Sequence, residues 1–162
     1  MNLRMRKRFL GWVLLISLSA FMVANSSCMS PKQKAAIDEA LKSLRKVASA
    51  TEVGVTYMKY GDLLIEAKAS LNEALLIMTN QKQKSILNDI MGCYEDAFTI
   101  WGRKIQNDHS TLSSSRSEDD SIIRKYRLPT EAGSMGDRTI DSNDALHRIW
   151  AIASSELASL SR

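Results

Sequence analysis

The 162-residue chain has few of the residues that most often carry chemistry, with two cysteines, two histidines and 6% aromatic residues. One disulfide, between Cys28 and Cys93, is the most that two cysteines allow. The histidines, His109 and His147, offer little for acid–base catalysis near neutral pH. H-E-x-x-H, paired C-x-x-C, Walker and G-x-S-x-G motifs are all missing. We therefore predict a protein that is not an enzyme and that has no metal site and no cofactor.

Positive charge is concentrated at the start of the chain. There are 22 Lys and Arg residues against 18 Asp and Glu, and four of the basic residues but none of the acids lie before position 28. The rest of the chain therefore carries 18 charges of each sign and is neutral overall. Nucleic-acid binding usually requires a basic surface that neutralises phosphates, so we predict no nucleic-acid partner.

The first 24 residues have the pattern of an export signal. Residues 1–8 are basic, and residues 9–24 form an uncharged apolar run. Sixteen residues of helix span about 24 Å, which is less than the roughly 30 Å hydrocarbon core of a bilayer. A signal peptide is therefore favoured over a membrane-spanning helix.

The residues after this run, Asn25, Ser26, Ser27 and Cys28, resemble the lipobox of bacterial prolipoproteins. The resemblance covers residues 1–28 only. It implies that residues 1–27 are a signal peptide and that Cys28 becomes the lipidated N-terminus of the mature protein. The mature protein would then be anchored by its lipid to the bacterial cell envelope, facing the periplasm or the exterior.

Two other fates fit the same residues. Ala24 and Ser26 form a small-x-small pattern, so cleavage after Ser26 would give a soluble secreted protein. An uncleaved apolar run would anchor the chain directly, and it would also leave the remainder outside. If Cys28 carries lipid, Cys93 is an unpaired thiol, and its apolar neighbours predict that it is buried.

Residues 28–162 are predicted to form a single all-α domain, a three- or four-helix antiparallel bundle. Apolar residues recur every three or four positions without strand-like alternation, which predicts helices over about 31–50, 55–79, 81–106 and 142–160. Start signals support the bounds, including Ser30 followed by Pro31 and the cap candidates Asp141 and Ser142. Trp101 and Trp150 are expected to meet in the core.

Two glycines, Gly54 and Gly61, lie seven residues apart between the first two apolar stripes. Two helices and one long helix both fit 31–79, and the lack of a Pro or Asn-Gly turn favours one kinked, continuous helix. Gly54, Tyr57, Tyr60 and Gly61 would then form a groove where another helix, from a second copy of the protein, could contact this one.

Residues 107–140 are predicted to be a long flexible loop before the last helix, because they are rich in Ser, Gly, Asp and Arg. Within them Ser121–Pro129 forms an apolar and basic island around Tyr126. We expect the island either to pack on the bundle as a short strand or turn, or to dock a partner.

These features predict a small helical envelope lipoprotein with a structural or accessory role in protein interaction. The candidate interaction residues are Gly54, Tyr57, Tyr60, Gly61 and Tyr126, and the partner is a protein, with self-association as one form of it. The alternative is a periplasmic binding module with a small apolar pocket between helices.

Overall fold

The computed structural model describes residues 29–107, 110–133 and 136–160, and it separates Met1–Ser30 from a compact unit that begins at Pro31. Cys28 and the predicted signal peptide lie outside the described residues. No helix in the described part of that unit has the length and apolar content that crossing a bilayer requires.

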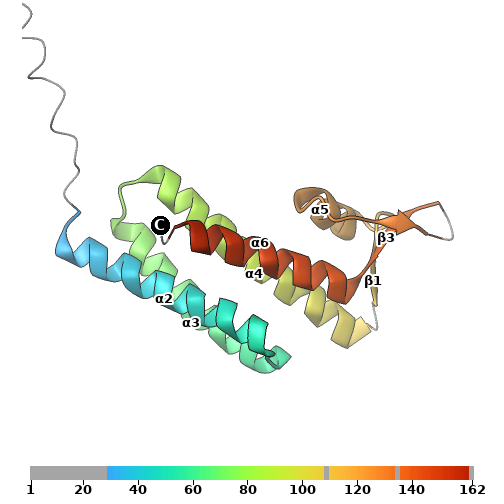
Figure 1. The fold of residues 1–162 in the computed structure, drawn as a ribbon, viewed down its shortest axis with the longest axis horizontal. Coiled ribbons are helices and arrows are strands. Elements are labelled where there is room, and N and C mark those ends of the chain that lie inside the picture. The colour runs from blue at the N-terminus through green and yellow to red at the C-terminus, as the bar shows by residue number, and fades with distance from the viewer. Residues whose placement is uncertain (1–28, 108–109, 134–135, 161–162) are drawn as a thin grey trace, which may run out of the picture. The chain divides into compact units, whose positions relative to one another are not determined.

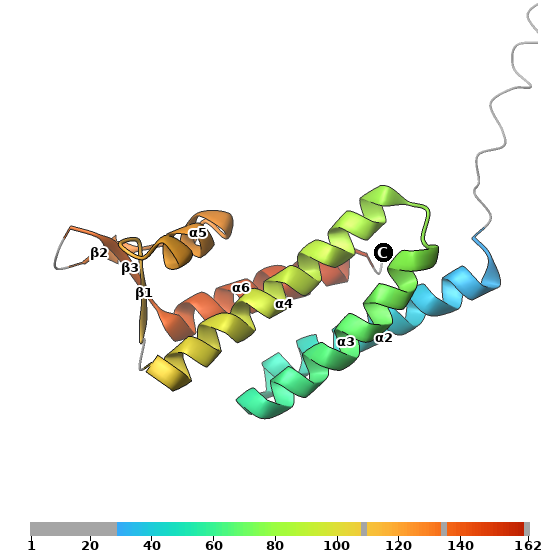
Figure 2. The same ribbon diagram turned by 180° about the vertical axis from the view of Figure 1, so that it is seen from behind.

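Four long helices form the body of this unit. They are α2 (Pro31–Val53), α3 (Tyr57–Ile77), α4 (Gln81–Asn107) and α6 (Ser142–Ser159). Consecutive helices run in opposite directions (Figures 1 and 2), and α2 packs on α3, α3 on α4, α4 on α6 and α6 on α2. We call these four helices the bundle.

Side chains cap three of the helices at their first turns. The Thr56 hydroxyl accepts a hydrogen bond from the Lys59 backbone N–H at 3.3 Å. At the start of α4, the Asn80 side chain accepts from the Gln83 N–H at 3.0 Å. The Asp141 carboxylate accepts from two N–H groups at the start of α6, as the sequence predicts. These bonds satisfy donors that lack a partner within the helix.

The bundle core consists of the apolar stripes that the sequence predicts. Ile37, Leu44, Leu71, Ile90 and Ile149 are among its buried side chains. Trp101 and Trp150 meet as expected, with ring centroids 5.8 Å apart in a T-shaped contact. The side chains bury because they repeat at helical spacing and so share one face of each helix.

The prediction of one continuous helix over 31–79 is wrong. Helix α2 ends at Val53, and Gly54 has φ +92°, a left-handed conformation that glycine adopts without steric strain. Such a glycine commonly ends a helix without any proline. The chain therefore reverses here, and α2 and α3 form an antiparallel pair.

The prediction of a flexible loop over 107–140 is also corrected, because most of this segment is folded. It contains β1 (Thr111–Ser113), α5 (Ser117–Lys125), β2 (Glu131–Ala132) and β3 (Arg138–Asp141). The strands form an antiparallel sheet in the order β1-β3-β2, with Leu112 opposite Ile140. The described chain is thus mostly helical but not all-α. We call residues 110–141 the insert.

The apolar island of the sequence anchors the insert, as a helix rather than as a strand or turn. Ile122 and Ile123 on α5 are buried, and so is Leu128, which follows that helix. The chain leaves α5 through Arg127, whose φ of 49° is unusual for a residue with a side chain. The island therefore has a packing role.

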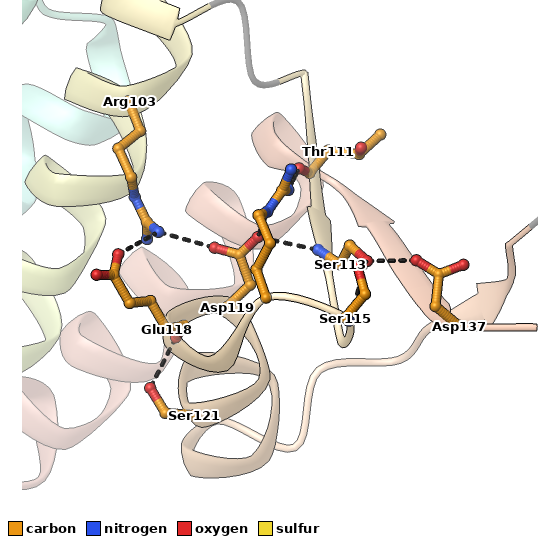
Figure 3. Close-up of polar contacts among 9 residues, drawn as sticks. Arg103, Thr111, Ser113, Ser115, Glu118, Asp119, Ser121 and Asp137 are labelled. Carbon is orange, nitrogen blue, oxygen red and sulfur yellow. Dashed lines mark hydrogen bonds and ion pairs between the residues drawn. The ribbon is translucent and has the colours of Figure 1, made fainter. Parts of the chain in front are cut away.

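A buried carboxylate connects the insert to the bundle (Figure 3). Asp119 on α5 is 2% exposed and accepts hydrogen bonds from Nη1 of Arg103 on α4 at 2.8 Å and from the Ser113 backbone N–H on β1 at 3.0 Å. It also pairs with Nε of Arg116. The buried charge is satisfied by two arginine side chains and one backbone N–H, the kind of partners that a desolvated carboxylate requires.

A second polar contact joins the end of α5 to the middle of α4. The Tyr126 hydroxyl donates to Oδ2 of Asp96 at 2.6 Å, and Lys125 Nζ lies 2.7 Å from the same oxygen. Burial, followed by the hydrogen bond to Asp96, raises the pKa of Tyr126. The tyrosine, one of the candidate interaction residues, is therefore held against the bundle.

Candidate functional site

Helix α3 is apolar on two faces. Its inner face supplies core residues such as Leu64 and Leu71, whereas its outer face carries Met58, Ile65 and Leu76, which are 76%, 73% and 84% exposed. The separations of seven and eleven residues are close to two and three helical turns, so these side chains form one narrow band. Exposed Ala69 lies in the same band. We call Met58, Ile65, Ala69 and Leu76 the α3 stripe.

The alignment of the α3 stripe distinguishes it from ordinary surface composition. Single exposed apolar residues are common on folded proteins, whereas aligned ones indicate a contact surface. Removing one such side chain fully from water would contribute about 1.5–3 kcal/mol. The stripe is therefore the strongest candidate for a binding surface in the described part of the chain.

A groove of about 340 Å³ lies beside the stripe, between α3 and α4. We call it the α3–α4 groove. Its apolar lining includes Leu64 and Ile65 from α3 with Met91 and Phe98 from α4. Gly61, Thr99 and the ion pair of Lys68 with Glu95 line the rest of it. Ile65 belongs to both the stripe and the groove. The two features therefore meet at Ile65.

Two glycines fix how closely α3 and α4 approach at this end of the groove. The Phe98 ring lies against Gly61, where a Cβ atom would be 3.2 Å from the ring. Tyr57 of α3 likewise lies against Gly102 of α4, where a Cβ atom on the glycine would be 2.7 Å from the Tyr57 hydroxyl oxygen. The Tyr57 and Phe98 rings stack with centroids 4.5 Å apart. Each helix thus places an aromatic ring over a glycine of the other.

Behind these rings, Tyr60 holds the wall of the site in place. Its fully buried hydroxyl donates to the Tyr94 carbonyl oxygen and accepts from Trp150 Nε1, both at 3.0 Å. Burial raises the pKa of Tyr60, which keeps the hydroxyl protonated. Trp101 packs on Tyr60 with ring centroids 5.9 Å apart. The Tyr60 hydroxyl is therefore hydrogen bonded on both sides inside an aromatic cluster.

One ion pair borders each side of the α3 stripe. Lys46 of α2 pairs with Glu66 on one side, and Lys68 pairs with Glu95 of α4 on the other. The hydrogen bond to Lys46 lowers the pKa of Glu66, and the reciprocal bond raises the pKa of Lys46. All four side chains reach solvent, so the pairs contribute little to stability but fix the charges that a partner would meet.

The structure separates the residues that the sequence groups as one interaction surface. Tyr57 and Gly61 lie at the aromatic end of the α3–α4 groove, as described above. Gly54 lies in the α2–α3 turn, Tyr60 is buried in the core, and Tyr126 lies at the end of α5. The close helix approach predicted at Gly61 is present, but the neighbouring helix is α4 of the same chain.

Cys93 and His147 lie in different surroundings. The Cys93 thiol is buried in the core beside Tyr126, and burial raises its pKa, which favours the unreactive thiol form. His147 lies on α6 against the Trp150 ring, with centroids 5.5 Å apart. Within the described residues, no three His, Cys, Asp or Glu side chains lie close enough to hold a metal ion.

A second hollow, of about 520 Å³, lies between the sheet and the start of α6. Glu131, Asp144 and Arg148 border it together with Thr111 and Thr139. Its charged side chains are exposed and of both signs, in contrast to the apolar α3–α4 groove. The sequence gives no sign of this hollow, because it exists only once the insert has folded onto α6.

Comparison of the chain with protein-family models, with curated proteins and with solved structures gave no match.

Sequence reasoning missed the α3 stripe, although a signal for it is present. Helical spacing over 55–79 places Tyr60, Leu64 and Leu71 on one face, which leaves Met58, Ile65 and Leu76 on the opposite one. A helix that is apolar on two faces and lies at the edge of a small bundle can bury only one of them. The second face is then left exposed to solvent.

Proposed function

We propose that this protein is a lipid-anchored accessory protein of the bacterial envelope that acts by binding a protein partner through the α3 stripe and the α3–α4 groove. The lipobox resemblance at Cys28 supports the anchoring. The exposed apolar surface of α3 supports the binding role.

One observation carries the binding role, namely that three large apolar side chains stand exposed in a line beside an apolar groove. Covering Met58, Ile65 and Leu76 would remove a surface that water disfavours, and each side chain contributes about 1.5–3 kcal/mol when fully buried. Protein interfaces commonly have an apolar centre with a polar rim. Here the ion pairs Lys46–Glu66 and Lys68–Glu95 provide that rim.

Photo-crosslinking from the stripe tests this role. A benzophenone amino acid replaces Ile65 in the full-length chain, which is expressed in the organism that encodes it. The control places the same group at exposed Ser155 on α6, the helix diagonally opposite α3. We expect a discrete protein adduct from position 65 and none from 155, with mass spectrometry identifying the partner. Equal labelling at both positions, or none at 65, would contradict the proposal.

The intact mass of the membrane-extracted protein tests the anchor. A chain that begins at Cys28 with added diacyl or triacyl mass supports lipidation. An unmodified chain that begins at Ser27 would instead show ordinary cleavage, and retention of Met1 would show an uncleaved segment. The variant Cys28→Ser should release the protein from the membrane fraction if lipid is its anchor.

A second function is favoured by the size of the α3–α4 groove. Its volume of about 340 Å³ lies in the range of small-molecule sites, and its lining is apolar. N-phenyl-1-naphthylamine serves as an apolar probe, with binding read as a rise in fluorescence and in Tm. Ile65→Lys should abolish the signal if the groove takes the probe. Leu76→Lys, outside the groove but within the stripe, should leave it unchanged.

A further inference from the structure

Four lysines gather at one end of the bundle. Helix α2 begins PKQK, with Lys32 and Lys34, and helix α4 begins QKQK, with Lys82 and Lys84. Because packed helices of the bundle run in opposite directions, α2 and α4 both begin at the end where α3 and α6 finish (Figures 1 and 2). We call the residues at this end, 31–37, 74–88 and 157–160, the lysine end.

Positive charge at the lysine end is not balanced locally. Its three ranges contain the four lysines and no Asp or Glu, although the chain from position 28 onwards is neutral as a whole. Lys34 pairs with Asp38 at 2.7 Å. Lys32, Lys82 and Lys84 form no ion pair with a described residue, and the first two of them are exposed. The lysine end therefore presents excess positive charge to solvent.

Helix stability does not account for these lysines. The first turn of a helix favours Asp and Glu, because its N–H groups carry partial positive charge. Neither α2 nor α4 has an acid in its first turn, and α4 is capped by the neutral Asn80. The opposite end of the bundle carries both signs, with Glu52, Lys59, Lys104 and Asp144. The charge at the lysine end therefore fits an anionic partner better than it fits the fold.

The chain leads from the lysine end directly back to Cys28. Helix α2 begins at Pro31, three residues after Cys28, and three extended residues span at most about 11 Å. A lipid on Cys28 that is inserted in a bilayer thus keeps the start of α2 within about this distance of the cysteine. The Debye length in physiological salt is about 8 Å, so the lysines nearest the tether would lie where the field of charged headgroups still acts.

We infer that the lysine end docks on the anionic phospholipid headgroups of the membrane that holds the Cys28 anchor. This inference rests on the proposed function, because it requires lipid at Cys28. The occupant follows from two observations, the unbalanced lysines and the short tether beside them. Each lysine near an anionic lipid surface strengthens attachment about fivefold.

Docking at the lysine end sets which surfaces point away from the membrane. The insert lies at the other end of the bundle (Figures 1 and 2), and the 27 residues of α4 separate the two ends by about 40 Å. The α3 stripe runs between these ends, from Leu76 near the lysine end to Met58 near the other. A partner in the same membrane would therefore reach Leu76 first, and the hollow beside the insert would face away from the lipid.

Fluorescence quenching tests the docking. The full-length chain is extracted from membranes and reconstituted in vesicles of phosphatidylcholine, with or without anionic phosphatidylglycerol, that carry a quencher on some headgroups. A fluorophore on Thr79→Cys reports on the lysine end, and one on Ala132→Cys reports on the insert, both at exposed positions. The parent chain gives the background labelling. We expect strong quenching at 79 on anionic vesicles, weak quenching at 79 on neutral ones, and none at 132.

Paired substitutions test whether the lysines cause the docking. Lys82→Gln with Lys84→Gln should lower the docking equilibrium constant on anionic vesicles about 25-fold, at about fivefold per lysine. The matched control, Lys59→Gln with Arg148→Gln, removes two exposed positive charges elsewhere and should leave docking unchanged. Added salt should weaken docking of the parent chain, because it screens the attraction. Circular dichroism confirms that the variants fold.

Failure of this inference is distinguishable from failure of the proposed function. No quenching at 79, equal quenching on both kinds of vesicle, or equal losses in the two double variants would overturn the docking. Acyl mass at Cys28 together with any of these results would retain the anchor and remove the docking alone. Absence of acyl mass would remove both. The binding role of the α3 stripe is decided separately, by crosslinking from position 65.

Discussion

The bundle and the insert are held together by different interactions. The buried side chains of the bundle are almost all apolar and repeat at helical spacing, with Ser43 as a polar member. The much smaller insert buries Ser113 and Asp119 and depends on hydrogen bonds from several segments. Apolar packing needs only shape and position, whereas a buried carboxylate needs each donor in place.

This difference predicts two levels of stability. The helices of the bundle share one large core, so they should unfold together. The insert rests on a few apolar side chains and on the contacts of Asp119 and Asp96, so it can open locally at a lower free energy. The following changes test that contrast, in order of expected effect.

The largest effect is expected for Tyr60→Ala in the bundle core. Replacing a buried aromatic side chain by alanine costs about 3–5 kcal/mol. The change also leaves Trp150 Nε1 and the Tyr94 carbonyl oxygen without this partner. Urea unfolding followed by far-UV circular dichroism should show one cooperative transition shifted for the whole protein. Tyr57→Ala, at a half-buried position, is the control with a smaller loss. An insert that keeps its structure after the bundle has unfolded would break the contrast.

Asp119→Ala should cost about 3 kcal/mol, and the loss should be confined to the insert. Arg103 and Arg116 lose their shared carboxylate, and the Ser113 N–H loses its acceptor. Hydrogen exchange should accelerate across 111–141 and remain slow in the middle of α3.

The neighbouring residue supplies a matched control. Asp120 also pairs with two arginines, Arg124 and Arg138, but these pairs lie at the surface. Asp120→Ala should therefore cost less than about 1 kcal/mol. Equal effects at 119 and 120, or faster exchange throughout α3 after Asp119→Ala, would show that the insert is not an independent unit.

Alkaline pH should weaken both regions through two different tyrosines. Burial raises the pKa of Tyr60 in the bundle and of Tyr126 in the insert. A raised pKa means that the stabilisation is fully present below the unfolded-state value of about 10 and is lost as the pH rises above it. At about pH 11 each of these tyrosines is largely deprotonated in the unfolded state but still protonated in the folded state. The free energy of unfolding should then be about 1.4 kcal/mol lower for each tyrosine.

Phenylalanine variants separate the two contributions. With Tyr60→Phe, the free energy of global unfolding should fall less between neutral and alkaline pH than it does in the parent protein. With Tyr126→Phe, the free energy of local opening of the insert should fall less over the same range. The measurement is the free energy of unfolding together with hydrogen exchange between about pH 8 and pH 11. An alkaline loss that is unchanged in both variants would exclude these tyrosines as its source.

The smallest effects concern a residue at positive φ in each region, and they should have opposite signs. Gly54→Ala in the α2–α3 turn should destabilise by about 1 kcal/mol, because alanine is strained at φ +92°. If Gly54 lay inside a helix, the same substitution would instead be expected to stabilise the protein, because alanine favours the helix more than glycine does. Arg127→Gly in the insert should stabilise by about 0.5 kcal/mol, because glycine relieves the strain at φ 49° at some entropic cost. Thermal unfolding measures both changes, and shifts of the same sign would be unexpected.

Much of the bundle was predictable because its signals are local. Ile90, Ala97, Leu146 and Leu157 repeat at helical spacing, and each is buried in the helix predicted for it. The break at Gly54 was missed because a glycine inside an apolar pattern fits both a kink and a helix end. Only its backbone conformation, fixed by α3 packing back on α2, distinguishes them.

The insert was not predictable in the same way. Strands β1 and β2 contain three and two residues, too few for an alternating pattern to be recognised. Leu112 pairs with Ile140, which lies far away in the sequence. Asp119, within a run of polar residues, reads as a solvated charge until Arg103 from another helix meets it. For the candidate site, Gly61 and Tyr57 lie where α3 meets α4 of the same chain, whereas Ile65 and Leu76 were assigned no role.

The sequence by itself determined the basic and apolar character of the first 24 residues, the neutral charge of the remainder and the helices with their buried stripes, because each follows from residues close together in the chain. The tertiary structure decided which apolar face of α3 is buried, because α2 and α4 cover one face and leave Ile65 outside. It also decided that Asp119 belongs to the interior, since a buried charge is stable only when distant segments bring its donors together.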